Sequence, residues 1–207
     1  MHVLHVVGAR PNFMKADPVI RAFDRRDRVR QTIVDTGQHY DANMSDVFFR
    51  ELGIPRPNVS LKVGSGSHAQ QTGEVMVRFE PVIYEQKPDL VLVYGDVNST
   101  VAATLVCAKL LVPIGHVEAG LRSFDRSMPE ETNRVLTDQM ADLLFTPSVD
   151  ADDNLLSEGV VPERIHLVGN VMVDTLVCLL PQSSYRWHGE ILRSWRGKRY
   201  GLVTLHR

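Results

Sequence analysis

The 207-residue chain has little cysteine and no long apolar run. Its two cysteines, Cys107 and Cys178, lie in apolar helical patterns, which predicts buried free thiols in a reducing compartment rather than a disulfide. No apolar run approaches the length that spans a membrane, and Met1 leads directly into an expected strand, so no signal peptide is expected. These absences predict a cytoplasmic protein with no membrane partner.

An excess of charge of one sign is also missing, because 23 lysines and arginines nearly balance 25 aspartates and glutamates. The composition therefore predicts no broad basic surface of the kind that binds nucleic acid. The segment Gly8-Ala-Arg-Pro11 has none of the glycine spacing of a dinucleotide-binding loop, which argues against NAD. The histidines outside the motifs described below have no ligand-like spacing, so no metal is predicted. We therefore expect a protein that works without a cofactor.

What the chain does have is an ordinary globular composition, with 43% hydrophobic residues, arranged as alternating strand and helix patterns. This repeated order predicts an α/β fold with a Rossmann-like, doubly wound parallel sheet and right-handed crossovers. Strands are predicted at residues 3–7, 32–35, 90–94, 110–114, 144–146 and 165–168, and helices at 13–23, 43–52, 68–87, 101–111, 130–142, 151–158 and 174–180.

Residues 181–184, Pro-Gln-Ser-Ser, have the composition of a linker. A short helix around 187–195 and a strand at 200–205 are predicted after it, and a strand that pairs with nothing is not stable. We therefore expect a Rossmann-like domain over residues 1–180, followed over 181–207 by a linker and the first strand of a truncated second domain. The chain is accordingly expected to be a fragment of a longer protein.

The densest charge pattern lies in residues 116–134, directly after the strand predicted at 110–114. Ligands of α/β proteins bind at the carboxyl ends of such strands. A mixture of carboxylates and guanidiniums suits proton transfer beside an anionic substrate. Gly120 as a hinge, Pro129 at the first position of a helix and acids in the first helical turn favour a built site over a plain charged loop. The charged residues are Glu118, Arg122, Asp125, Arg126, Glu130, Glu131 and Arg134.

Seven short motifs occur in order along nearly the whole chain: Gly8-Ala-Arg-Pro-Asn-Phe-Met-Lys15, Thr36-Gly-Gln-His39, Tyr94-Gly-Asp-Val-Asn-Ser-Thr100, His116-Val-Glu-Ala-Gly-Leu-Arg122, Pro129-Glu-Glu-Thr-Asn-Arg134, Gly169-Asn170 and Thr204-Leu-His-Arg207. In these motifs the sequence resembles the N-terminal half of the non-hydrolysing UDP-N-acetylglucosamine 2-epimerases. The resemblance implies one half of a GT-B-type two-domain fold, with the active site in the cleft between the domains.

The resemblance further implies an activity and partners. Members of the family invert C2 of UDP-GlcNAc to give UDP-ManNAc for cell-surface polysaccharides, so UDP-GlcNAc and UDP are the expected ligands. They are generally homodimers that associate through the N-terminal domain. In this chain the helices predicted at 43–52 and 70–87 carry enough apolar residues to form such a contact face.

Four catalytic residues follow from the resemblance. Asp96, Glu118 and Glu130 match family carboxylates implicated in catalysis, and His206 matches a family histidine that contacts the diphosphate. The reaction removes the proton at C2, expels UDP from C1 and later returns a proton to the other face of the sugar. Such a cycle needs acid and base groups on opposite faces and cationic help for the departing diphosphate.

Four further residues are expected to bind the substrate. Arg10 and Lys15 match family residues that line the cleft, and guanidinium donors and helix N-termini suit a phosphate-bearing ligand. Arg122 and Arg134 complete the set, because Arg134 lies one helical turn after Glu130 and shares its face.

Alternatives remain at several positions and for the whole protein. Asp96 could cap the following helix instead of facing a ligand, Glu131 could act only on the helix dipole, and Arg134 could form an exposed ion pair with Glu130. A glycosyltransferase with the same two-domain fold, a hydrolysing epimerase that releases ManNAc and UDP, and a non-catalytic truncated remnant are the other functions considered. The 207 residues alone are expected to have no epimerase activity.

Overall fold

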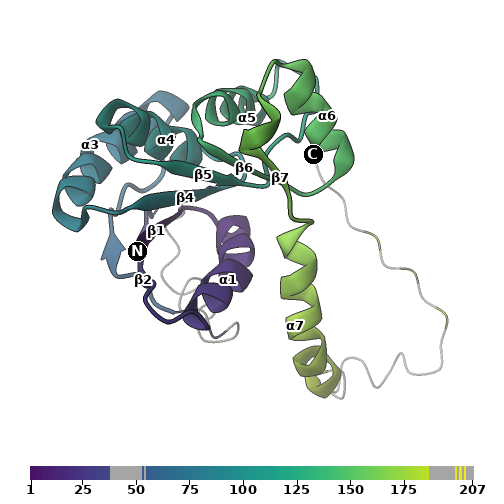
Figure 1. The fold of residues 1–207 in the computed structure, drawn as a ribbon. Coiled ribbons are helices and arrows are strands. Elements are labelled where there is room, and N and C mark those ends of the chain that lie inside the picture. Colours follow the sequence, from purple (N-terminus) through teal and green to yellow (C-terminus); the bar gives the residue numbers. More distant parts are fainter. Residues whose placement is uncertain (38–52, 54, 187–198, 200, 202, 204–207) are drawn as a thin grey trace. The chain divides into compact units, whose positions relative to one another are not determined.

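A computed structural model describes residues 1–37, 53, 55–186, 199, 201 and 203 of the chain. The helices expected at 43–52 and 187–195, and most of the strand expected at 200–205, lie outside these residues. The elements alternate along the chain (Figure 1) as β1 (His2–Val7), α1 (Arg10–Asp24), β2 (Arg30–Asp35), β3 (Val59–Ser60), α3 (His68–Gln86), β4 (Leu90–Tyr94), α4 (Asn98–Leu110), β5 (Ile114–Val117), α5 (Pro129–Met140), β6 (Leu143–Thr146), α6 (Val149–Ser157), η1 (Pro162–Arg164), β7 (Ile165–Leu167) and α7 (Val171–Arg186).

The strands form one seven-stranded sheet in the order β3-β2-β1-β4-β5-β6-β7, and every neighbouring pair is parallel. This confirms the predicted doubly wound, Rossmann-like fold. The strand order reverses between β1 and β4, and ligands of such sheets bind in the crevice outside the carboxyl ends at that point. A ligand-binding site is therefore expected at the loops that follow β1 and β4.

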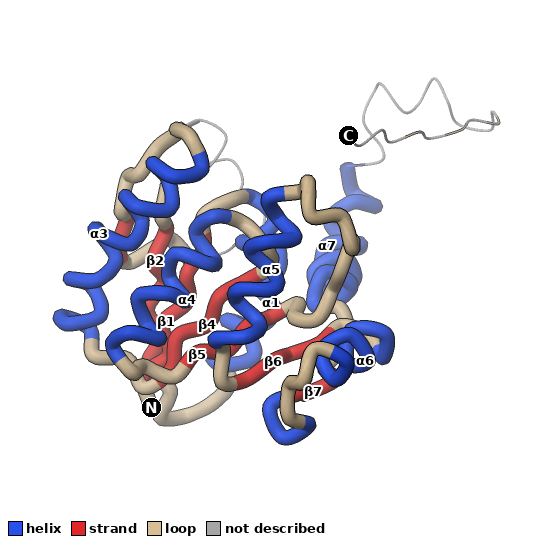
Figure 2. Tube along the Cα trace, turned by 90° about the horizontal axis from the view of Figure 1, so that it is seen from above, coloured by secondary structure: helices blue, strands red, loops and turns tan. Residues whose placement is uncertain are grey.

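Helices cover both faces of the sheet. Figures 1 and 2 show α3, α4 and α5 along one face and α1 on the other. The central strands β1 and β4 are buried along their whole length, as expected for a parallel sheet covered on both sides. Successive side chains point to opposite faces, so Leu4 and Val91 join the core under α3 and α4, while Val3 and Leu92 join the core under α1. None of the helices that the structure describes is long and apolar enough to cross a membrane.

The strand predicted at residues 110–114 is misplaced, because the observed strand β5 covers Ile114–Val117. Leu110 is the last residue of α4, and Leu111 ends that helix in a left-handed conformation with φ of 56°. β5 begins only at Ile114, where its pairing with β4 starts. A short apolar run does not distinguish the buried end of a helix from a strand. As a result β5 carries His116, and the strand ends within the charged motif itself.

The linker predicted at residues 181–184 lies within α7, which runs through Pro181 to Arg186. Proline's fixed φ is compatible with a helix, at the loss of one backbone hydrogen bond. The chain divides into a compact unit, Met1–Thr175, and a second unit, Leu176–Arg207. Cys107 is buried as predicted, whereas Cys178 is exposed, since it belongs to the second unit and to neither core cluster.

Candidate active site

Four of the predicted site residues meet above the carboxyl ends of β1, β4 and β5. Lys15 lies on α1 and its ammonium forms an ion pair with the carboxylate of Glu118, which follows β5. Arg134 lies on α5 and donates from Nη2 to Oδ2 of Asp96, which follows β4, at 2.5 Å. All four side chains are largely but not fully buried, with 10–26% of each exposed. Such partial burial suits groups that must contact both the protein and a ligand.

Gly95 allows the two ion pairs to lie side by side. It separates β4 from Asp96 and has φ of 62°, in the left-handed region that glycine tolerates best. A Cβ atom at Gly95 would lie 2.6 Å from Nζ of Lys15 and 3.3 Å from Oε2 of Glu118. The Lys15–Glu118 pair therefore packs directly over the Gly95 backbone, one residue from Asp96.

The loop after β1 is tied to the end of β4 by Asn12. Oδ1 of Asn12 accepts hydrogen bonds from the backbone N–H groups of Gly8 and Ala9, at 3.2 and 2.9 Å, and its Nδ2 donates to the carbonyl of Tyr94 at 2.7 Å. This buried amide fixes the start of α1 against the switch point. Arg10 is the first residue of α1, but its side chain lies outside the described part of the structure, as does the whole of His206.

Arg134 also binds Glu131, which is the buried member of the Glu130-Glu131 pair. The carboxylate of Glu131 accepts from Nη1 of Arg134 at 3.0 Å and from the backbone N–H groups of Ser123 and Phe124, each at 3.0 Å. Burial by itself would raise the pKa of Glu131, but the hydrogen bonds from Ser123, Arg134 and Phe124 outweigh it and lower the pKa to about 2. Glu131 therefore anchors the loop before α5 and is not merely a helix-dipole residue.

A pH-dependent contribution to stability follows from that lowered pKa. The ionised form of Glu131 stabilises the folded chain above its ordinary pKa of 4.5, and this contribution is lost as the pH falls towards about 2. We expect Glu131→Gln to lower the urea midpoint by a constant amount above about pH 5, and by progressively less below it. Glu130→Gln, at the exposed neighbouring position, serves as the matched control. A deficit for Glu131→Gln that stayed unchanged down to pH 2 would contradict this assignment.

The backbone of Glu118 is strained. Its φ of 74° places a non-glycine residue in the left-handed region, at a cost of about 1–2 kcal/mol. The strain is held by the carbonyl of Phe145 in β6, which accepts hydrogen bonds from the N–H groups of Glu118 at 3.0 Å and Ala119 at 3.1 Å. Backbone strain of this kind clusters at functional sites, where the surroundings over-determine the geometry. In this backbone conformation the Glu118 side chain points towards Lys15.

A second charge cluster lies behind Glu118, with Arg122 and Asp138 buried and Glu158 partly exposed. Nη1 of Arg122 binds Oδ2 of Asp138 at 2.8 Å, and its Nε and Nη2 bind both oxygens of Glu158 at 2.7 and 2.8 Å. Only 1% of the Arg122 side chain is exposed. Burial opposes its charge, but Glu158 and Asp138 more than compensate and raise the pKa of Arg122 above its usual range. In this structure its guanidinium is thus occupied by protein carboxylates.

Comparison with known proteins identifies the family of this chain. A family model described as UDP-N-acetylglucosamine 2-epimerase matches residues 21–207. The chain belongs to this family. A UDP-N-acetylglucosamine 2-epimerase homolog of Methanococcus maripaludis is 49% identical over all of this chain and 57% of its own length. The UDP-2,3-diacetamido-2,3-dideoxy-D-glucuronate 2-epimerase of Pseudomonas aeruginosa is 51% identical over 84% of this chain and 50% of its own. The chain thus spans about half the length of the curated relatives it matches.

Solved structures agree with this assignment. The UDP-GlcNAc 2-epimerase of Methanocaldococcus jannaschii, in complex with UDP-GlcNAc and UDP, has a TM-score of 0.87 and 43% identity over 94% of this chain and 53% of its own. A lipopolysaccharide outer core galactosyltransferase is only 15% identical, with a TM-score of 0.57, and so shares the fold alone. The epimerase-family chain therefore has the fold of one half of a GT-B-type protein.

The structure of this family member separates the predicted site residues into groups. Lys15, Asp96, Glu118 and Arg134 lie together, as described above. Glu130 is exposed and, among the described residues, makes no hydrogen bond or ion pair, so Arg134 does not form the alternative pair with it. Arg134 binds Asp96 instead, and α4 begins after Val97 without a side-chain cap, so Asp96 does not cap that helix.

Three residues of the epimerase-family site region were missed from the sequence: His116, Asp138 and Glu158. A usable signal existed for one of them. Asp138 lies seven residues after Glu131 and four after Arg134, so all three occupy one face of α5, and this face is buried. A row of charged residues on the buried side of a helix indicates a polar network rather than a solvated surface.

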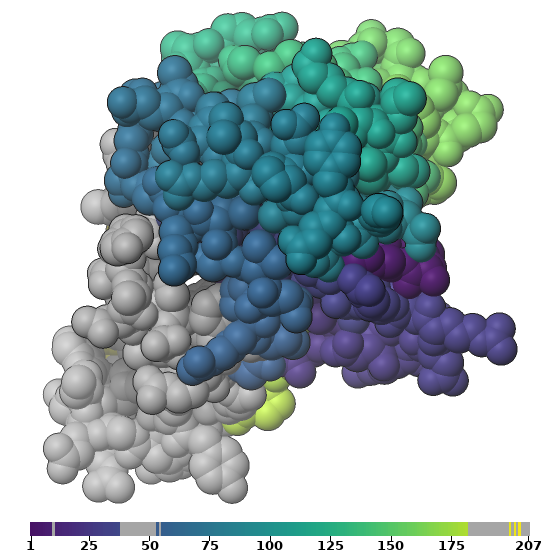
Figure 3. Space-filling model, turned by 90° about the vertical axis from the view of Figure 1, so that its left-hand side faces the viewer, coloured from purple at the N-terminus to yellow at the C-terminus, as the bar shows by residue number. Residues whose placement is uncertain are grey.

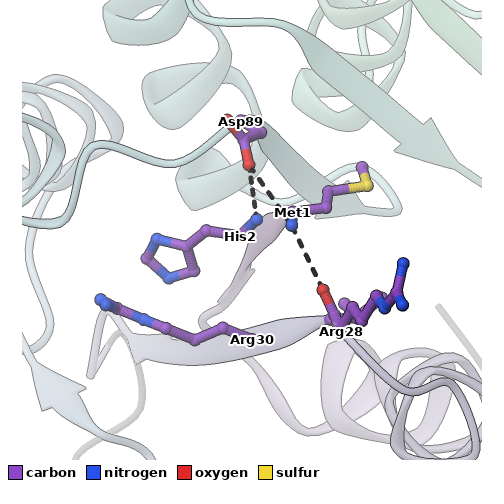
Figure 4. A pocket seen from close by; sticks show the side chains of 6 residues that line it. Met1, His2, Arg28, Arg30 and Asp89 are labelled. Carbon is purple, nitrogen blue, oxygen red and sulfur yellow. Dashed lines mark hydrogen bonds and ion pairs between the residues drawn. The ribbon is translucent and has the colours of Figure 1, made fainter.

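A pocket elsewhere on the domain contributes nothing to this site. It is lined by Met1, His2, Arg28, Val29, Arg30 and Asp89 (Figure 4). It lies at the amino ends of β1 and β2, whereas the site lies at the carboxyl ends of β1, β4 and β5. Asp89 accepts a hydrogen bond from the backbone N–H of His2 at 2.6 Å, so its carboxylate holds the first residue of β1. Nor do the described residues include a group of three or more His, Cys, Asp or Glu arranged to hold a metal ion.

Proposed function

We propose that the protein carrying this chain converts UDP-GlcNAc to UDP-ManNAc, without hydrolysis, for the synthesis of cell-surface polysaccharides. The observation that carries the proposal is the meeting of Lys15, Asp96, Glu118 and Arg134 at the switch point of the sheet. A relative with 43% identity has been crystallised with UDP-GlcNAc and UDP, which supports a uridine diphosphate sugar as the ligand.

The chemistry proceeds by elimination and re-addition of UDP. A base takes the proton from C2, the electron pair forms the C1–C2 double bond, and the C1–O bond to UDP breaks. The intermediate is 2-acetamidoglucal with free UDP. UDP then returns to C1 while an acid delivers a proton to the opposite face of C2, so that no electron is gained or lost and no redox cofactor is needed. Asp96, Glu118 and Glu130 share these proton transfers.

The cations of the site have different parts in this scheme. Lys15, Arg10 and His206 bind the diphosphate and stabilise the charge that develops as it departs. Lys15 lies against Glu118, which places a base next to the leaving-group side of the substrate. Arg134, through its bonds to Asp96 and Glu131, holds Asp96 above the end of β4.

Product analysis tests the reaction type. The protein is incubated with UDP-GlcNAc and the mixture followed by proton NMR. Formation of UDP-ManNAc is the expected result. Release of free ManNAc and UDP would identify a hydrolysing epimerase, and transfer of the sugar to an added acceptor would identify a glycosyltransferase; either would overturn the proposal.

A second candidate substrate comes from the Pseudomonas aeruginosa relative, whose 51% identity slightly exceeds that of the archaeal relatives. It acts on a UDP-2,3-diacetamido-2,3-dideoxy-D-glucuronate, which differs from UDP-GlcNAc at C3 and C6 and undergoes inversion at the same C2. The elimination scheme applies to both sugars. Comparison of kcat/KM for the two substrates decides between them.

The 207 residues are proposed to be inactive by themselves, because the chain spans about half the length of its relatives. Purified chain should show no turnover of UDP-GlcNAc above a mock preparation from the same host. Turnover above that of the mock preparation would contradict this.

A homodimer is proposed to form through α3, which Figure 3 shows exposed as a blue surface. Val77 and Tyr84 lie two turns apart on one face of α3, and 69% and 60% of these residues are exposed. At micromolar concentration, light scattering should give twice the chain mass. Changing both residues to Asp should give the monomer mass, whereas the control Leu156→Glu on α6 should leave a dimer. A monomeric wild type would refute the proposal.

A further inference from the structure

Asp138 is the centre of a buried network that joins the two catalytic loops. None of its side chain is exposed. Its Oδ1 accepts from Nδ1 of His116 at 2.6 Å, and its Oδ2 accepts from Arg122 at 2.8 Å and from the backbone N–H of Gly120 at 3.1 Å. Three donors on one carboxylate use most of its hydrogen-bonding capacity. Asp138 on α5 therefore contacts β5 and the loop that follows it.

His116 extends the network to the end of β4. Its Nε2 donates to the carbonyl of Gly95 at 2.9 Å, and the ring is fully buried. A carbonyl can only accept, so Nε2 of His116 carries a proton and the opposite edge of the ring, Nδ1, lies against the carboxylate of Asp138. His116 thus connects the residue before Asp96 to the helix that carries Arg134.

We propose that Asp138, acting through His116 and Arg122, is the positioning residue that fixes the catalytic carboxylates Asp96 and Glu118 relative to each other. This inference rests on the proposed epimerase function.

The strain in the loop after β5 is the first argument. Glu118 and Gly120 both have left-handed φ values, 74° and 79°. The loop is clamped at Gly120 from two helices, by Asp138 of α5 on its N–H and by Asn154 of α6 on its carbonyl at 2.9 Å. Removing one clamp lets the backbone relax from a conformation that it would not adopt alone.

The charge balance of the network is the second argument. The guanidinium of Arg122 faces two carboxylates, Asp138 and Glu158, and His116 forms a hydrogen bond with Asp138. Burial opposes the ionisation of Asp138, but His116 and Arg122 hold its pKa below the usual range. Buried ion pairs add little net stability compared with apolar packing, because their desolvation is costly. The position of this network directly behind the site is better explained by its holding Asp96 and Glu118 in place than by a gain in stability.

Steady-state kinetics with UDP-GlcNAc on the protein carrying this chain provide the first test. Asp138→Asn keeps the size of the side chain but removes one of the two carboxylates that face the buried guanidinium of Arg122. We expect kcat to fall by about 10²-fold, as for a small misplacement of reacting groups, while KM changes by less than about threefold. Val106→Ala, a buried substitution near the far end of α4, is the control for general loss of packing and should keep kcat. A lowered melting temperature with unchanged kcat in Asp138→Asn would overturn the proposal.

The coupling between the residues is tested by a double-mutant cycle. If Asp138 acts through His116, then Asp138→Asn combined with His116→Gln should lower kcat no further than the stronger single change. Additive losses would show that the two act separately and would contradict the proposal. If Asp138→Asn does not fold, Glu158→Gln takes its place. It weakens Arg122 from the solvent side and should lower kcat by about tenfold at similar KM.

A measurement without substrate separates this inference from the proposed function. Backbone amide chemical shifts and hydrogen exchange are recorded on the 207-residue chain with and without Asp138→Asn. We expect faster exchange and shifted resonances at Asp96, Glu118 and Gly120, which Val106→Ala should leave in place. Unchanged amides there would overturn the positioning role even if the protein is an epimerase. Changed amides in a protein that does not convert UDP-GlcNAc would instead indicate that only the function is wrong.

Discussion

Replacing Glu118 by glutamine is expected to lower kcat for UDP-GlcNAc by about 10²-fold or more, as loss of a general acid–base group typically does. The change preserves the size of the side chain and its hydrogen bond to Lys15, but an amide cannot take a proton from C2. The fold should be retained, because the backbone bonds of Glu118 and Ala119 to Phe145 do not involve the side chain. The measurement is kcat from initial rates, with circular dichroism as a check on folding.

Two further variants serve as a control and as a second test of the proton transfers. Glu163→Gln, on the exposed η1 helix, changes the same chemistry far from the site and should leave kcat unaltered. Glu130→Gln should also lower kcat, because Glu130 is proposed to share the proton transfers. If Glu118→Gln kept more than half of the wild-type kcat, Glu118 would not be a base of the reaction.

Gly120→Ala is expected to have the largest effect on stability. The φ of Gly120 is 79°, and an added Cβ would lie 2.4 Å from the carbonyl oxygen of Ala151, a backbone atom that cannot rotate away. The left-handed conformation and the clash together should reduce the free energy of unfolding by roughly 2–5 kcal/mol. Urea denaturation of the wild type and the variant measures the difference.

Gly159→Ala is the matched control for that experiment. Gly159 has φ of 84°, but a Cβ there would meet nothing within 4 Å. It should therefore cost only the backbone term, about 1–2 kcal/mol. Equal losses for the two variants would mean that the contact between Gly120 and α6 does not hold the loop.

Much of the fold could be predicted because its signals are local. The apolar runs at β1 and β4 and the helical spacing in α1 and α3 come from residues adjacent in sequence, and their alternation implies a parallel sheet. The errors arise where two structures share one local signal. Leu110 continues an apolar run whether it ends a helix or begins a strand, and only the pairing of Ile114 with β4 decides the matter.

The site was predictable to the extent that its residues follow strands. Glu118 comes directly after β5, and only Gly95 separates Asp96 from β4, so topology alone brings both to one edge of the sheet. The role of Arg122 could not be found in this way. Its partner Glu158 lies 36 residues further along the chain, directly after the end of α6, a helix whose acids look solvated in sequence. Pairings between distant side chains depend on tertiary packing, which a single sequence does not reveal.

Incorporation of solvent deuterium at C2 tests the central claim most directly. The protein that carries this chain is incubated with UDP-GlcNAc in deuterium oxide, without added NAD, and the product is analysed by proton NMR. Elimination and re-addition predict UDP-ManNAc in which C2 carries deuterium from its first appearance, because the returning proton comes from a group in exchange with solvent. A product that kept its original hydrogen at C2, or that formed only when NAD was supplied, would contradict the mechanism and the roles of Asp96, Glu118 and Glu130.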